Sequence, residues 1–452
     1  MKRILTAVLV LVVIVAAALP PLFGARARSL IEAELASIGE AVSSHATVEV
    51  SFHDWDVGWF SSTASVSLGV ELNREALELD GQDPQALSTT LKLVTLYHGP
   101  VLIEPLAGLG WGAVELVVDA SLVPELRDFH EAAGVDHVAR LGVLVGLSST
   151  TIGMDMPAFV YEEAGATGQG VGIDFGGLEA TVVFDGRGES LEFDGEVGGV
   201  GITTPGWNAE VGRASWASNA REDARIPELW LGGGQVDVAR VMVSSGDGGL
   251  VEVNDIRLQG GTEIDGDDLV ATYLYEAREA VITTTRLDEL AAEASVRYGY
   301  EALARLMEAV YNLEALDEEQ QMALINALVR ERLTFAIDRL GFEHEDRAAL
   351  ASLQIDFRGA ELPDWFDISR SLDLSAILPW VSADVDLVFH RDLLNGLGIG
   401  QMDALVRILA REGMVKESGD DYTLNVGFED GTLTVNGEPV EPFELLGLLS
   451  GL

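Results

Sequence analysis

Apolar and polar residues alternate along much of the chain from about residue 46 onward. Val48, Val50 and Phe52 alternate with polar neighbours, and the pattern returns in residues 64–70 after a short aromatic stretch. A period of two is typical of a β-strand that is buried on one side, and two such runs around a glycine-containing bend favour a hairpin. Similar runs, many of which end in turn dipeptides such as Asp-Gly or Gly-Gly, occupy residues 91–99, 113–122, 170–186, 190–204, 234–245 and 250–260.

From about residue 286 the spacing of apolar residues changes to that of helices. Asp317 and Gln320 resemble a capping box, which predicts that a second helix begins there and runs to about Leu340. We therefore expect a helical hairpin that packs on the sheet, although the same apolar stripes could form a dimer interface. The two stripes comprise Leu303, Leu306, Met307, Val310 and Tyr311, then Ile325, Leu328, Val329, Leu333, Ala336, Ile337 and Leu340.

Strand-like alternation returns in residues 351–362 and 382–394, and a helix is expected over residues 401–411. Residues 422–440 alternate again and contain Asp-Gly and Asn-Gly, which are strong signals for tight hairpin turns. The sequence thus predicts an α+β fold, dominated by an antiparallel β-rich sheet that is extended or bent. It divides into a membrane anchor (1–24), a β-rich region (25–285), a helical hairpin insertion (286–350) and a C-terminal β plus helix region (351–452).

The N-terminus predicts one transmembrane helix. Lys2 and Arg3 precede an apolar run over residues 4–23, which is about the length that crosses a bilayer. A cleaved signal peptide is the alternative, because residues 25–27 have the small-x-small form of a cleavage site. We favour an uncleaved anchor, followed by a short helix over residues 29–42. Either reading sends residues 29–452 across the inner membrane.

The charge balance excludes some functions. The chain has 74 acidic and 28 basic residues and a formal net charge of −46, and the acids are dispersed. Nucleic-acid binding needs a basic patch, so no nucleic-acid partner is expected. The few lysines and many acids suggest a surface adapted to high salt, although codon bias in a GC-rich genome is an alternative. The absence of cysteine excludes disulfides and thiolate chemistry.

No motif predicts catalysis or a cofactor. The seven histidines form no His-Glu-x-x-His pattern, and there is no Gly-x-Ser-x-Gly elbow or phosphate-binding loop. The acidic run over residues 263–269 lacks the spacing of a calcium loop. We therefore assign no catalytic, metal-binding or cofactor-binding residues.

One stretch, HDWDVGWFSSTASVSL (residues 53–68), gathers aromatic and hydroxyl side chains at the bend between two predicted strands. With two later segments, it resembles the YdgA family (DUF945), and the matching blocks frame nearly the whole chain. We interpret these residues as structural rather than catalytic, because no general base lies at a fixed spacing from the serines. The residues that carry the resemblance are Gly58, Phe60, Ser61, Ser62, His98, Gly99, Pro100, Asn436, Gly437 and Pro439.

The resemblance implies a bacterial envelope protein that is held at the inner membrane and faces the periplasm. Its biochemical activity is not established, self-association has been suggested within the family, and no catalytic residues can be transferred. Two hypotheses remain. The first is a non-enzymatic protein that binds a protein partner or lipid near the membrane, with a homo-oligomer left open. The alternative is a carboxylate-dependent hydrolase that acts on envelope material, since paired carboxylates leave no sequence motif.

The anchor predicts a topology that reporter fusions can test. Alkaline phosphatase fused after Leu452 should be active, whereas a reporter that works only in the cytoplasm should be inactive, because the chain beyond the apolar run is exported. N-terminal sequencing of the mature protein tests whether the run is retained. The opposite reporter pattern would contradict the topology, and a mature chain that begins near Arg28 would favour a signal peptide.

Overall fold

The chain forms two compact units. The first comprises Met1–Pro205 with Arg213–Ala217, and the second comprises Gly206–Gly212 with Ser218–Leu452. The computed structural model describes residues 46–57, 61–72, 87–98, 101–102, 108–118, 133–135, 137–163, 170–226, 229–301, 303–305, 333–357, 380–397 and 400–440.

The first unit is an antiparallel sheet whose strands mostly pair with their neighbours in the sequence. A short β4 (Val101–Leu102) pairs with β5, and β8 (Phe159–Glu163), β9 (Val171–Phe175) and β12 (Val200–Thr203) form a further ladder. The main order is β1 (Ala46–Val57), β2 (Ser61–Leu72), β3 (Leu87–His98), β5 (Gly108–Val118), β6 (Ala139–Gly146), β7 (Ser149–Met156), β10 (Leu178–Asp185) and β11 (Ser190–Val197).

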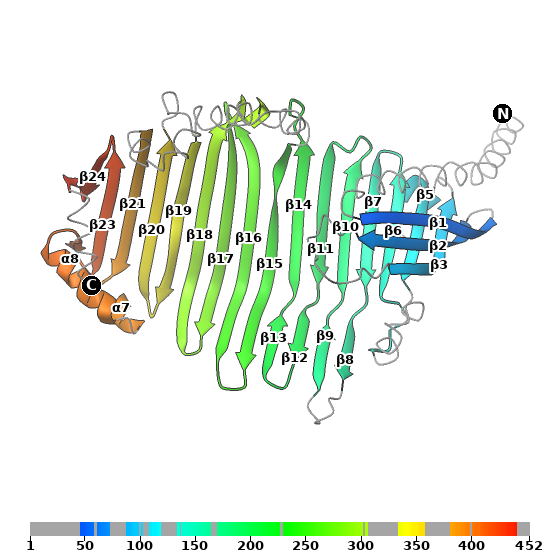
Figure 1. Cartoon of the computed structure of the whole chain (residues 1–452), viewed down its shortest axis with the longest axis horizontal. Coiled ribbons are helices and arrows are strands. Elements are labelled where there is room, and N and C mark those ends of the chain that lie inside the picture. Colours follow the sequence, from blue (N-terminus) through cyan, green and yellow to red (C-terminus); the bar gives the residue numbers. More distant parts are fainter. Residues whose placement is uncertain are drawn as a thin grey trace, which may run out of the picture. The chain divides into compact units, whose positions relative to one another are not determined.

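The second unit is an antiparallel meander, and its strands β15 to β21 run side by side in Figure 1. Residues of β14 (Ala214–Glu222) belong to both units, and β22 (Lys416–Ser418) pairs with the start of β23. The order is β13 (Trp207–Val211), β15 (Trp230–Ser245), β16 (Leu250–Asp265), β17 (Asp268–Ile282), β18 (Thr285–Gly299), β19 (Leu333–His344), β20 (Arg347–Phe357), β21 (Val381–His390), β23 (Asp421–Glu429), β24 (Thr432–Val435) and β25 (Glu438–Pro439).

The strongly β-rich, antiparallel architecture confirms the prediction from alternation. The two C-terminal turns also lie where the sequence placed them, at Asp430-Gly431 and Asn436-Gly437, and both residues of each turn have positive φ. That backbone matches a type I′ hairpin, which favours Asn or Asp followed by glycine. The β19–β20 turn, at Glu345-Asp346, has positive φ at both positions without any glycine, so its sequence gave no turn signal.

The helical hairpin predicted for residues 286–350 is wrong at both ends, where β18, β19 and the start of β20 lie. Residues 300–301 and 303–305 are helical, and residues 306–332 lie outside the described part of the chain. The error has a physical cause in β19. Ile337 and Leu340 oppose Leu353 and Ala351, so β19 has one extra residue at this point. This β-bulge converts the period of two into a spacing of three, which imitates a helix.

Two apolar clusters lie within the second unit. In one, α7 (Leu393–Gly396) and α8 (Gly400–Arg411) supply side chains to a cluster with Phe389 and Tyr422, so the helix expected over residues 401–411 is confirmed. The other contains Ile226, Leu269 and Tyr300. The hydroxyl of Tyr300 donates a hydrogen bond to Asp223. Burial raises the pKa of Asp223, but this hydrogen bond and two backbone N–H donors outweigh it and lower the pKa.

The predicted anchor, residues 4–23, lies outside the described residues, as does the short helix expected over residues 29–42. Across the residues that the structure does describe, none of the helices combines the length and apolar character needed to cross a bilayer.

Candidate functional site

The strand register of the second unit aligns apolar residues in rows that cross the sheet. Directly opposed residues of neighbouring strands point to the same face, and so do residues two positions apart along one strand. One row crosses eight strands, from β15 to β23, and every member is apolar. The row comprises Val236, Leu258, Tyr275, Ala292, Leu340, Ala351, Leu387 and Leu424.

Two further rows on the same face cross the same eight strands, and Thr262 is their one polar member. With the first row they define what we call the apolar face. The second row comprises Gly234, Gly260, Tyr273, Ala294, Ile337, Leu353, Val385 and Val426. The third comprises Gly232, Thr262, Ala271, Val296, Phe335, Ile355, Ala383 and Phe428.

The apolar face is open to solvent in its middle. Leu258 is 41% exposed, Tyr273 57%, Tyr275 38% and Leu340 50%. The ring of Tyr273 lies 3.6 Å from the point where a Cβ on Gly260 would be, so it packs over the bare backbone of its cross-strand partner. The apolar face therefore presents large side chains to water rather than to a covering layer of described residues.

Both apolar clusters lie on this face, beside the three open rows. Phe389 and Tyr422 continue the pattern two residues beyond Leu387 and Leu424, and they pack with side chains of α7 and α8. On the other side of the rows, Leu269 is two residues before Ala271 and packs with Ile226 and Tyr300. The open rows thus lie between two packed regions.

Tyr298 shows how apolar the surroundings of this face are. Tyr298 lies two residues beyond Val296 on β18, so its side chain is on the same side of the sheet as the apolar face. It packs against the cluster that contains Leu269. Burial raises the pKa of the Tyr298 phenol, and the neighbouring Tyr273 raises it further. Removing a phenolate from water is unfavourable, so the shift reports a poorly solvated environment.

The opposite face of the same sheet is charged. Asp237, Arg257 and Glu276 oppose one another on three neighbouring strands. Arg257 Nε lies 3.1 Å from Asp237 Oδ1, and its Nη1 lies 3.9 Å from Glu276 Oε2. Hydrogen bonds from Gln235 and Arg257 lower the pKa of Asp237 despite some desolvation. The sheet is therefore amphipathic, with one apolar and one charged face.

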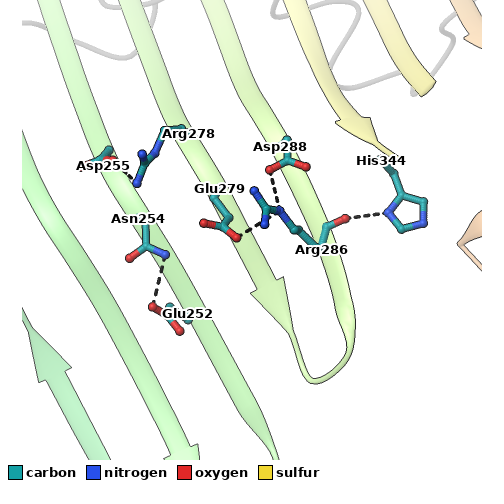
Figure 2. Close-up of polar contacts among 8 residues, drawn as sticks. All are labelled: Glu252, Asn254, Asp255, Arg278, Glu279, Arg286, Asp288 and His344. Atoms are coloured by element: carbon teal, nitrogen blue, oxygen red, sulfur yellow. Dashed lines mark hydrogen bonds and ion pairs between the residues drawn. The ribbon is translucent and has the colours of Figure 1, made fainter. Parts of the chain in front are cut away.

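A group of polar side chains lies one row beyond the apolar face, and Figure 2 draws all of its members except Arg240. The row next to the apolar face is also apolar and comprises Val238, Ile256, Ala277 and Leu290. Two positions farther along each of these strands, the opposed residues are polar: Arg240, Asn254, Glu279 and Asp288. We call the following residues the polar band: Arg240, Glu252, Asn254, Glu279, Arg286 and Asp288.

Arginines hold the polar band together, each between two carboxylates. Arg286 Nε lies 3.1 Å from Glu279 Oε1 and 2.9 Å from Asp288 Oδ1. Arg240 Nε lies 3.1 Å from Glu252 Oε1, which also accepts a 3.2 Å hydrogen bond from Asn254 Nδ2. These partners fix the side chains in one layer above the backbone.

The backbone around the polar band is also constrained. Asp255 and Glu289 have positive φ in mid-strand, and both flank Arg278, whose Nη2 lies 2.6 Å from Asp255 Oδ2. A non-glycine residue in this conformation costs about 1 kcal/mol or more. Nearby, the buried His344 donates from Nδ1 to the carbonyl oxygen of Arg286 over 2.6 Å, which ties β19 to the β17–β18 hairpin (Figure 2).

The structure brings two of the three family motifs together. Ser61 and Ser62 open β2 and oppose Tyr97 and Leu96 of β3, so His98 follows directly after their partners. Val57 opposes Ser62, which confirms that the chain reverses as a hairpin at the aromatic stretch. The remaining residues of these two motifs, Gly58, Phe60, Gly99 and Pro100, lie outside the described residues.

The third motif, in the second unit, surrounds Asn436. Its Oδ1 accepts a 3.1 Å hydrogen bond from the backbone N–H of Asn425, and its Nδ2 donates to the carbonyl of Met414 over 2.9 Å. Gly437 completes the turn with positive φ, and Pro439 of β25 opposes Thr434 of β24. Asn436 thus joins a turn, a strand and the segment after α8, which is a structural role.

Within the described ranges, no group of three or more His, Asp or Glu side chains is arranged to hold a metal ion. The arrangement that stands out is an open antiparallel sheet with one apolar face and a polar band on the same unit. The chain belongs to DUF945, because the family model described as "Bacterial protein of unknown function (DUF945)" matches residues 1–443. This confirms the resemblance found in the sequence. No curated protein and no solved structure matches the chain.

The contacts of Asn436 predict a loss of stability on truncation. Asn436→Ala should lower the free energy of unfolding by about 2–3 kcal/mol, because it removes two side-chain hydrogen bonds and a residue that tolerates positive φ. Denaturant unfolding would measure this. Asn436→Asp keeps the acceptor for Asn425 and should lose less. Equal stability of the alanine variant and the natural protein would refute the structural role.

Proposed function

We propose that this protein is a non-enzymatic envelope protein that binds the acyl chains of lipids on its apolar face. In this proposal residues 4–23 anchor the chain in the inner membrane, and the bulk of the chain after them lies in the periplasm. The proposal combines the expected anchor with the surface found in the second unit.

The observation that carries the proposal is that three rows across eight strands are apolar except at Thr262, with large side chains exposed in the middle. Covering about 200 Å² of such a surface would contribute roughly 5 kcal/mol before the costs of binding. An apolar ligand therefore has a clear physical reason to bind here.

The dimensions of the apolar face suit an acyl chain. Strands in a sheet lie about 4.8 Å apart, so seven steps between eight strands span roughly 34 Å. One leaflet of the bilayer core is about 15 Å thick, which sets the length of an ordinary acyl chain. A single row is thus long enough for an extended chain. A protein segment would also have to satisfy its backbone polar groups, and the apolar face offers almost no partners for them.

The alternative, a carboxylate-dependent hydrolase, would be favoured by two carboxyls of raised pKa in one cleft. Where the structure is described, the carboxyls with shifted pKa are Asp223, Asp237 and Asp247, and in each the pKa is lowered. These shifts favour the ionised form, whereas a general acid must keep its proton. The direction of these pKa shifts therefore supports the binding protein over the hydrolase.

Photo-crosslinking tests the proposal directly. The full chain, purified in detergent, would be irradiated with phosphatidylcholine that carries a diazirine at the end of one acyl chain. We expect crosslinks in peptides of β16–β19, separate from those in residues 4–23, which any membrane anchor would give. Leu340→Glu should reduce the crosslinks in β16–β19 about five-fold or more, because an acyl chain beside a carboxylate leaves that charge poorly solvated.

Leu350→Glu is the matched control. The exposed fraction of Leu350, 43%, is similar to that of Leu340. Leu350 opposes Gly341 and Val388, so its side chain lies on the other face of the sheet. It should leave the crosslinks unchanged, and thermal unfolding would show that both variants fold. Crosslinks confined to residues 4–23, or an equal loss in both variants, would overturn the proposal.

A further inference from the structure

We infer that the polar band makes the apolar face selective for lipids whose head group carries an ammonium group, such as phosphatidylethanolamine. This inference rests on the proposed function and specifies the lipid class. It follows from where the polar band lies, from its charge and from the partial burial of Glu252 and Glu279.

The polar band lies where the head group of a bound lipid would be. On each strand, four residues lead from the first row of the apolar face to the band: Tyr275 is followed by Ala277 and then Glu279, and Ala292 is preceded by Leu290 and then Asp288. Four residues of a strand span about 13 Å. A lipid whose chain lies on the apolar face can therefore reach the band with its polar end.

The band carries more carboxylates than guanidinium groups. Arg286 lies between Glu279 and Asp288, and Arg240 lies between Glu252 and Glu210, whose Oε1 is 4.0 Å from Nη1 of Arg240. Both arginines are thus neutralised, and one net negative charge remains around each. The ammonium group of a lipid would be attracted to these carboxylates. The adjacent guanidinium groups would donate hydrogen bonds to the phosphate of the same lipid.

Partial burial strengthens this preference. The side chains of Glu279 and Glu252 are only 20% and 23% exposed, so salt and water screen them less than they screen surface charges. A purely anionic head group, such as phosphatidylglycerol, would bring a negative charge to these carboxylates with no ammonium group to offset it. The chain as a whole repels it too, since its formal net charge is −46.

The strained backbone next to the band is a further reason to regard it as a site. Asp255 and Glu289 hold the left-handed conformation between the band and the row of Ile256 and Leu290. Strain of this kind is kept where the surrounding structure requires one geometry, and it gathers at binding sites. Here it lies between the last apolar row and the first charged residues of two strands.

The test compares three diazirine lipids with identical acyl chains on the full chain in detergent. The head groups are phosphatidylethanolamine, its N-acetylated form, which has no ammonium group, and phosphatidylglycerol. In pairwise competition, phosphatidylethanolamine should give about five-fold more crosslinking in β16–β19 than either of the others. The preference should shrink as the salt concentration rises to about 0.5 M, because the attraction is electrostatic.

A pair of matched variants connects the preference to the band. Glu279→Gln removes one carboxylate from the band and should reduce the preference to about two-fold or less. Glu276→Gln removes an arginine-paired carboxylate of the same strand from the opposite face and should leave it unchanged. If Glu279→Gln fails to fold, the comparison of the three lipids on the natural protein still decides the question.

The outcomes separate the two proposals. Equal crosslinking by all three lipids in β16–β19, or a preference for phosphatidylglycerol, would overturn the inference and leave lipid binding intact. No crosslinking in β16–β19 by any of the lipids would overturn both.

Discussion

The second unit depends on a shared strand register. The side-chain period of a strand is two, so a slip of one residue in any pairing would move that strand's apolar set to the charged face. Eight strands must keep the same phase to form the apolar face. Tight turns hold this phase where strands are consecutive: Asp265 and Asp268 close one hairpin, and Ile282 and Thr285 close the next. Each turn leaves two residues unpaired, which allows no slack for a slip.

The β-bulge in β19 keeps the apolar side chains of that strand on the apolar face. The extra residue in β19 lies between Ile337 and Leu340, and both of these side chains still meet apolar partners on either side. A β-bulge at this position disrupts the backbone pairing locally, but it keeps Ile337 and Leu340 aligned with the apolar rows. On the other side of the sheet, the ion pair of Arg278 with Asp255 accompanies the strained backbone at the edge of the polar band. The residues with positive φ therefore lie where the surface changes from apolar to charged, whereas the bulge lies within the apolar face and keeps its rows aligned.

Local features of the fold could be predicted from the sequence, whereas the site could not. Alternation and turn dipeptides identified the strands and the C-terminal turns, because both signals come from neighbouring residues. The C-terminal end of the predicted helical hairpin was wrong because a bulge in β19 imitates helical spacing. The apolar face exists only after pairing, and no local signal states that Ala292 will oppose Leu340 across residues 300–332. The family motifs pointed elsewhere, to residues such as Asn436 whose contacts are structural.

The acidic composition and the open apolar face belong to one physical argument. An exposed apolar surface of this size would ordinarily drive two copies together or cause aggregation. Arginines here neutralise only part of the acidity: Arg240, Arg257 and Arg286 each contact two carboxylates. The excess negative charge repels a second copy that approaches through the same face. In the proposed function, a lipid with an ammonium group would meet no such repulsion, so the same charge would disfavour a second copy on the face and favour this lipid.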